Sequence, residues 1–180
     1  MNESGDSQAP AALGGNWFAC VGMPLPTSEL HALDCVLQQQ GLLLGAVIET
    51  VERWQAAAAF IRAAERDCLW WDREESERER LWDIAAATHG ESALLETLNV
   101  VRERIAATVQ VAAVGAMARA GVDDPDLLRE AVAATLLAAH QEALTRLAGE
   151  GEDHFFAIKY RLFLAGRWPL GLQGGRFAVF

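Results

Sequence analysis

The spacing of apolar and polar residues predicts a chain built mainly from helices. After a segment at 14–27 that mixes Gly, Pro and two aromatic residues, apolar residues recur every three or four positions, with charged residues between them. This period matches a helical turn and predicts one buried face on each helix. We expect helices over residues 27–40, 42–66, 72–90, 92–120, 124–149 and 152–165.

Residues typical of helix ends support these boundaries. Asp124 followed by Pro125 is typical of an N-cap with proline in the first helical position. Thr27 or Ser28 can cap the first helix in the same way. Glycine follows several predicted C-terminal ends, where its left-handed conformation closes the last turn, at Gly41, Gly121 and Gly166.

The last residues depart from the helical period. Residues 167–180 contain Gly174 and Gly175 between two apolar runs, which predicts a β-hairpin, and Pro169 confines its first strand to a sheet edge. A chain of 180 residues can bury a sufficient core in a single domain. We therefore predict an all-α fold, a bundle of five to six helices with a short C-terminal β-hairpin. The domain covers 16–180 and follows a flexible N-terminal leader at 1–15.

Charge is unevenly distributed along the chain. The formal net charge is −10, yet residues 159–180 contain four basic residues and no Asp or Glu, so the acidic excess lies on residues 1–158. We expect an acidic helical body with a basic, aromatic C-terminal segment. Lys159 is the only lysine beside fourteen arginines, a bias that we interpret as the mark of a GC-rich bacterial genome.

Composition excludes several classes of protein. A pI near 4.8 argues against binding to double-stranded nucleic acid. The longest apolar run, Ile105 to Ala118, is shorter than the roughly twenty residues of a membrane span, so we expect a buried helix there and no membrane contact. Three scattered cysteines and a leader without a basic or apolar run favour a cytoplasmic protein.

Motifs for catalysis are missing from the sequence. It contains no GxSxG, GxGxxG or Walker-type pattern, and no Glu lies three residues before any of the four histidines, as a di-iron site requires. His31 and Cys35 are one helical turn apart and are weak candidates for a metal site, because two ligands do not complete one. We expect no catalytic residue, no cofactor and no metal.

A tryptophan pair followed by charged residues is a candidate interface. Adjacent Trp70 and Trp71 cannot share one helical face, so we expect at least one to be partly exposed. Large aromatic residues with mixed charge are typical of interface hot spots. The predicted partner-binding face has Trp70 or Trp71 as its anchor and acidic residues around it, at Asp72, Glu74, Glu75, Glu77 and Glu79.

The basic C-terminal segment allows three interpretations. Its arginines can form ion pairs with the acidic body while Trp168 and Phe177 close one end of the core. Alternatively the hairpin edge, with Arg167, Trp168 and Arg176, can present a docking surface to an anionic or β-edged partner. Binding of a small anion or nucleotide is the third interpretation.

These observations favour an interaction protein over an enzyme. We hypothesise a small acidic protein-binding module, of the immunity or antitoxin type, that neutralises a basic partner protein. One alternative is a metal-binding helical enzyme that uses His31 and Cys35, with His89 or His140. Another is a ligand-sensing helical domain with a pocket at Ala106 to Ala116. The small residues of that run also permit a homo-oligomer.

Overall fold

The computed structural model describes residues 15–42, 46–63 and 68–180. The predicted leader at 1–15 lies, except for residue 15, outside the described residues. Within them the chain forms six helices and three strands, which confirms the predicted helical bundle with a C-terminal hairpin: α1 (Thr27–Gln39), β1 (Val47–Thr50), α2 (Trp54–Arg62), α3 (Cys68–His89), α4 (Glu91–Arg119), α5 (Pro125–Leu147), α6 (Phe155–Leu164), β2 (Pro169–Gln173) and β3 (Arg176–Val179).

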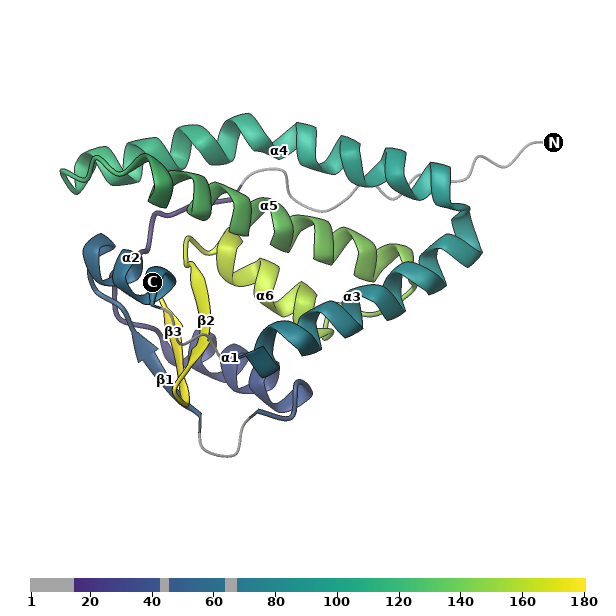
Figure 1. The fold of residues 1–180 in the computed structure, drawn as a ribbon, viewed down its shortest axis with the longest axis horizontal. Coiled ribbons are helices and arrows are strands. Elements are labelled where there is room, and N and C mark those ends of the chain that lie inside the picture. The colour runs from purple at the N-terminus through teal and green to yellow at the C-terminus, as the bar shows by residue number, and fades with distance from the viewer. Residues whose placement is uncertain (1–14, 43–45, 64–67) are drawn as a thin grey trace.

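Four helices are stacked in the order α4, α5, α6 and α1 (Figure 1). Helix α4 is the outermost layer, and α3 crosses one end of the stack, where it contacts both α4 and α5. Helix α6 is the most deeply buried, since only Arg161 and Leu164 among its ten residues are more than marginally accessible. The apolar core therefore runs through α6, with α5 on one side and α1 on the other.

The three strands form one small sheet in the order β1-β3-β2. Strand β3 is central: it pairs antiparallel with β2 through the Gly174-Gly175 turn, and parallel with β1, where Val47 pairs with Arg176 and Thr50 with Val179. Strand β2 lies at an edge of the sheet, as predicted from Pro169, which has no backbone N–H to donate to a neighbouring strand.

The helix predicted over 42–66 is wrong. In the described part of that range (42 and 46–63), the chain forms β1 and the short helix α2 instead. The run Val47-Ile48-Glu49-Thr50-Val51 is rich in β-branched residues, which favour strands, and Val51 N–H donates to the Val179 carbonyl at 2.7 Å. The apolar positions fit a helical period, but pairing with β3 decides the outcome.

The predicted caps are largely confirmed. Asp124 is the N-cap of α5 and accepts a hydrogen bond from Leu127 N–H at 3.0 Å, with Pro125 as the first helical residue. The first helix begins at Thr27, but its N-cap is Pro26, which supplies no side-chain bond. The three predicted C-terminal glycines adopt the left-handed conformation, with φ of 64° at Gly41, 66° at Gly121 and 90° at Gly166.

An aromatic cluster joins the sheet to the segment before α1. Trp17 and Phe18 are buried, so this segment is docked on the body of the protein. Phe18 packs edge-on against Trp168 with ring centres 6.2 Å apart, and Trp54 packs edge-on against Phe180 at 4.9 Å. These contacts hold the hairpin, the start of α2 and the N-terminal segment in one core.

Helix α4 is buried on one face only. Ile105, Val109 and Ala113 are fully buried, but Val111 is 72% exposed and Val114 46% exposed. The prediction of a buried helix over 105–118 is therefore wrong for the outward face. No helix among the described residues combines the length and the apolar composition of a bilayer span.

Candidate functional site

The two adjacent tryptophans at the start of α3 point in different directions. Trp70 is 2% exposed, and its ring lies 4.8 Å from that of Phe177 on β3, so it belongs to the core. Trp71 is 42% exposed. Neighbouring residues of a helix are separated by about 100°, so burial of one ring leaves the other at the surface. Trp71 is therefore the tryptophan that a partner can reach.

Trp71 stands in the wall of a groove between α3, α5 and β2. Two adjoining cavities, of about 180 and 90 Å³, share Trp71, Glu130, Ala134, Pro169 and Leu170 in their linings. We call these five residues, with the two cavities, the Trp71 groove. Its walls are mainly apolar, and its larger cavity is additionally lined by Leu137 of α5 and Phe163 of α6.

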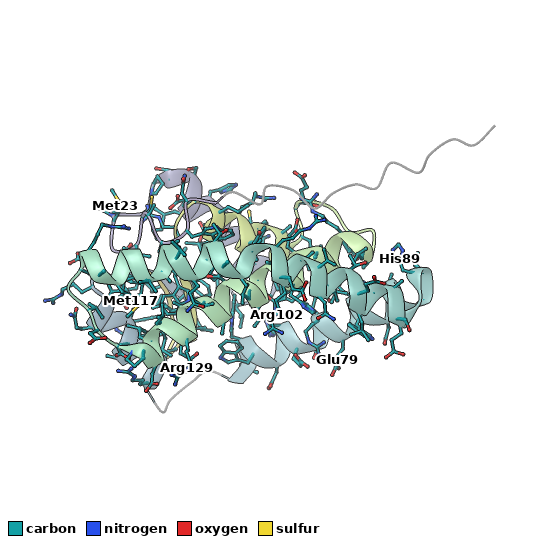
Figure 2. All side chains as sticks on the ribbon, turned by 90° about the horizontal axis from the view of Figure 1, so that it is seen from above. Met23, Glu79, His89, Arg102, Met117 and Arg129 are labelled. Carbon is teal, nitrogen blue, oxygen red and sulfur yellow. The ribbon has the colours of Figure 1, made fainter. Side chains whose placement is uncertain are left out.

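Glu130 lines the Trp71 groove, and further exposed acids follow Trp71 along α3. Asp72, Glu75 and Glu79 are exposed on α3, as is Glu130 on α5. Figure 2 shows Glu79 at the outer margin of the molecule. Glu75 pairs with Arg78, whose hydrogen bond holds the pKa of that carboxyl below its usual range. We call Asp72, Glu75, Glu79 and Glu130 the acidic rim.

Three rim residues lie outside the described ion pairs, although Glu79 is close enough to Arg78 to raise its pKa. Asp72, Glu79 and Glu130 form no ion pair with another described side chain. An exposed carboxylate without an ion-pair partner can attract a cationic group, most strongly at low salt. The rim is thus available for electrostatic recognition.

Two of the predicted surface acids point inward instead. Glu74 is 3% exposed and its carboxylate lies 2.5 Å from the Lys159 ammonium, while Gln141 donates to it at 3.4 Å. Lys159 also lies over the Phe156 ring at 5.4 Å. This ion pair joins α3 to α6 beneath the larger cavity. Glu74 therefore stabilises the fold and supports the groove from below.

Glu77 is the second inward acid and fixes the start of α6. One of its carboxylate oxygens lies 2.8 Å from His154 Nε2 and 2.7 Å from an Arg80 nitrogen. His154 is the N-cap of α6, where its Nδ1 accepts from Phe156 N–H at 3.2 Å. The Arg80 hydrogen bond, followed by that of His154, lowers the pKa of Glu77. Glu77 is a structural residue that docks α6 on α3.

The C-terminal candidates are divided between interior and surface. Arg167 is 5% exposed: its Nε donates to Glu29 at 2.8 Å, and its other nitrogens donate to three carbonyl groups, of Cys20 and Met23 at 2.6 Å and of Pro24 at 2.8 Å. Trp168 is 2% exposed. Both therefore bind the N-terminal segment to the body and are inaccessible to a partner.

Arg176, unlike Arg167 and Trp168, is exposed. Its guanidinium lies 3.3 Å from the Glu49 carboxylate across the β1–β3 pair. The interior positions of Arg167 and Trp168, together with this pair, favour the first interpretation of the basic segment, in which it closes the core and pairs with the acidic body.

The weak metal candidates lie apart from any ligand set. His31 is exposed and Cys35 is partly buried, one turn apart on α1. No group of three His, Cys, Asp or Glu side chains suited to a metal occurs in the described part of the chain. His89 is exposed on α3 and bonds the Leu147 carbonyl at 2.9 Å, whereas burial lowers the pKa of His140 on α5.

Sequence reasoning missed half of the groove. Glu130, Ala134 and Leu137 follow one another at four- and three-residue spacing on α5, a pattern that also fits the buried face of a helix. Leu170 lies on the edge strand β2, which borders the larger cavity together with α3. Only the packing of α5 and β2 beside α3 brings these residues to Trp71.

Comparison of the chain with protein-family models, with curated proteins and with solved structures finds no match. The site is therefore interpreted from its own geometry.

Proposed function

We propose that this chain is a small protein-binding module that captures a basic partner protein with the Trp71 groove and its acidic rim. The observation that carries the proposal is the exposure of Trp71, at 42%, in an apolar groove near exposed carboxylates, of which only Glu75 has a described ion-pair partner, Arg78. A rigid aromatic anchor surrounded by charge is the composition of an interface hot spot.

The charge of the chain favours a basic partner over an acidic one. The chain carries a net charge of −10, and the rim concentrates that charge beside the groove. Acidic complementarity accelerates encounter with a basic partner and disfavours acidic proteins. Lys159 and Arg167, which reduce the acidity of the sequence, are buried and so contribute little to the outer surface.

An immunity or antitoxin-type role in the cytoplasm is the biological form that we propose. A basic nuclease or membrane-active toxin presents the cationic surface that the rim requires, and a groove that is already formed lowers the ordering cost of binding. Cys20 and Cys35 are free thiols, which suits a reducing compartment.

The test is to immobilise the full chain, identify the basic protein that it retains from a lysate of the source cells, and titrate that purified protein by calorimetry at several salt concentrations. We expect the Kd to rise by about tenfold or more between low and high salt. We expect Trp71→Ala to raise the Kd by about thirtyfold, because it removes the anchor.

A charge-matched pair of variants separates the rim from net charge. Asp72→Lys reverses a rim residue, and Asp34→Lys makes the same change at an exposed position of α1. Asp72→Lys should weaken binding by about tenfold and Asp34→Lys by less than about twofold. Affinity that is independent of salt, or equal losses in the two variants, contradicts the proposal.

A further inference from the structure

The outward face of the C-terminal half of α4 is apolar and is not covered by any other described residue. Val111 is 72% exposed and Val114 46% exposed, and Ala107 and Ala118 are exposed at the four-residue spacing that keeps all four on one side of the helix. Figure 1 shows α4 as the outermost layer, and Figure 2 is viewed onto its uncovered side. We call Ala107, Val111, Val114 and Ala118 the α4 patch.

A shallow depression extends the α4 patch toward α5. It has a volume of about 450 Å³ and is lined by residues of the end of α4 and the start of α5, among them Val114, Ala118, Val122 and Leu128. None of the residues of this depression belongs to the Trp71 groove. The α4 patch is therefore a second surface, independent of the proposed partner site.

The helical part of this surface carries no acidic residue, although exposed Glu103 precedes it and Asp123 and Asp124 line the depression beside it. Residues 105–122 contain no Asp or Glu, although the chain carries a net charge of −10. The acidic surfaces of two copies repel each other at contact, because salt at physiological strength screens charges only beyond about 8 Å. The α4 patch is a place where two copies can approach without that repulsion.

We propose that the α4 patch binds the same patch of a second copy of this chain, with the two α4 helices antiparallel. A twofold axis between residues 112 and 113 places Val111 against Val114 of the second copy, and Ala107 against Ala118 of the second copy. A symmetric dimer requires such a self-complementary surface. The small alanines permit the close helix contact, with axes about 8 Å apart, that such packing needs.

The charges at the ends of the α4 patch fit this arrangement and identify the occupant. The same axis places Arg104 of one copy beside the α4–α5 turn of the other, where Asp123 is exposed. Arg104 and Asp123 form no ion pair with another described residue within one chain. Symmetry makes the contact twice, so complementary charges border valines and alanines on both sides.

Sedimentation equilibrium of the full chain over a range of concentrations tests the dimer. We expect a monomer–dimer equilibrium in the wild type, and a dimer Kd raised by about tenfold or more in Val111→Glu and in Val114→Glu, because each buries an unpaired carboxylate. Leu95→Glu is the matched control: Leu95 is 46% exposed on the same helix, as Val114 is, but lies outside the patch. It should change the Kd by less than about twofold.

A charge exchange tests the register. Arg104→Asp and Asp123→Arg should each raise the dimer Kd by about tenfold, and the double variant should restore it to within about threefold of the wild type. Circular dichroism establishes that each variant is folded. A monomer at every concentration, a dimer that resists both valine substitutions, or a double variant without recovery overturns the proposal.

Discussion

The two faces of α3 use the same residue types for opposite purposes. On the inward face Trp70 packs on Phe177, and Glu74 forms a buried ion pair with Lys159. On the outward face Trp71 and Asp72 meet solvent. A buried charge is costly to leave unpaired, whereas an exposed charge is screened and contributes little to stability. The inward face therefore fixes the fold, and the outward face is free to change with the partner.

The largest effect should come from breaking the inward ion pair. Lys159→Met leaves the Glu74 carboxylate buried without its cation, and we expect a loss of about 3–5 kcal/mol in the free energy of unfolding. Urea denaturation measures this loss. The double variant Glu74→Gln with Lys159→Met removes both charges and should recover most of the stability; no recovery would show that the two side chains act independently.

The same comparison applies to Arg167, a second buried cation, which lies in the C-terminal segment. Arg167→Met removes the hydrogen bonds that Arg167 donates to Glu29 and to three carbonyl groups, and we expect a loss of about 3 kcal/mol in the free energy of unfolding. The segment at 16–24 should also become sensitive to limited proteolysis. Arg176→Met is the control: its side chain is 60% exposed, so the loss should stay below about 0.5 kcal/mol. Equal losses in the two variants would contradict the division into interior and surface arginines.

Burial also has a measurable effect on Tyr160, the only tyrosine. Burial, followed by the negative charge of Glu142, raises the pKa of Tyr160 to about 12 from an ordinary value of 10.0. The unfolded chain loses this proton near pH 10 and the folded chain near 12, so stability should fall as pH rises through that interval. Absorbance of the tyrosinate gives both midpoints, and a midpoint near 10 in the folded protein would disprove the shift.

The smallest effect should come from the outward face of α3. Glu75→Gln removes an exposed carboxylate that pairs with Arg78, and it should change the free energy of unfolding by less than about 0.5 kcal/mol. Thermal unfolding is the measurement. A loss of more than 1 kcal/mol would mean that the acidic rim supports the fold, against its assignment to recognition.

An element can be predicted from the sequence when the residues that determine it lie close together along the chain. Caps such as Asp124 and the period of α4 and α5 lie within a few residues, so those helices were predicted with their ends. Strand β1 was missed because Val47 and Ile48 become a strand only by pairing with β3, at the far end of the chain. Local patterns do not contain that contact.

The candidate site was predicted in part for the same reason. The tryptophan pair and the acids beside it were visible in the sequence, but which tryptophan is exposed depends on the rotation of α3 against the sheet. Glu74 lies one helical turn after Trp70 on the buried face of α3, where it pairs with Lys159 of α6, whereas Glu79 lies on another face of the helix. The apolar walls from α5 and β2 come from packing alone.

The central position of β3 also sets the order in which the protein can assemble. Strands β1 and β2 both hydrogen-bond to residues 176–179, so during synthesis β1 leaves the ribosome long before its neighbour exists. Contacts of such long sequence separation form late. The helices can collapse as they emerge, while this sheet closes only after β3 is released, and a nascent chain stalled before β3 exposes Trp54 and Trp70 to chaperones.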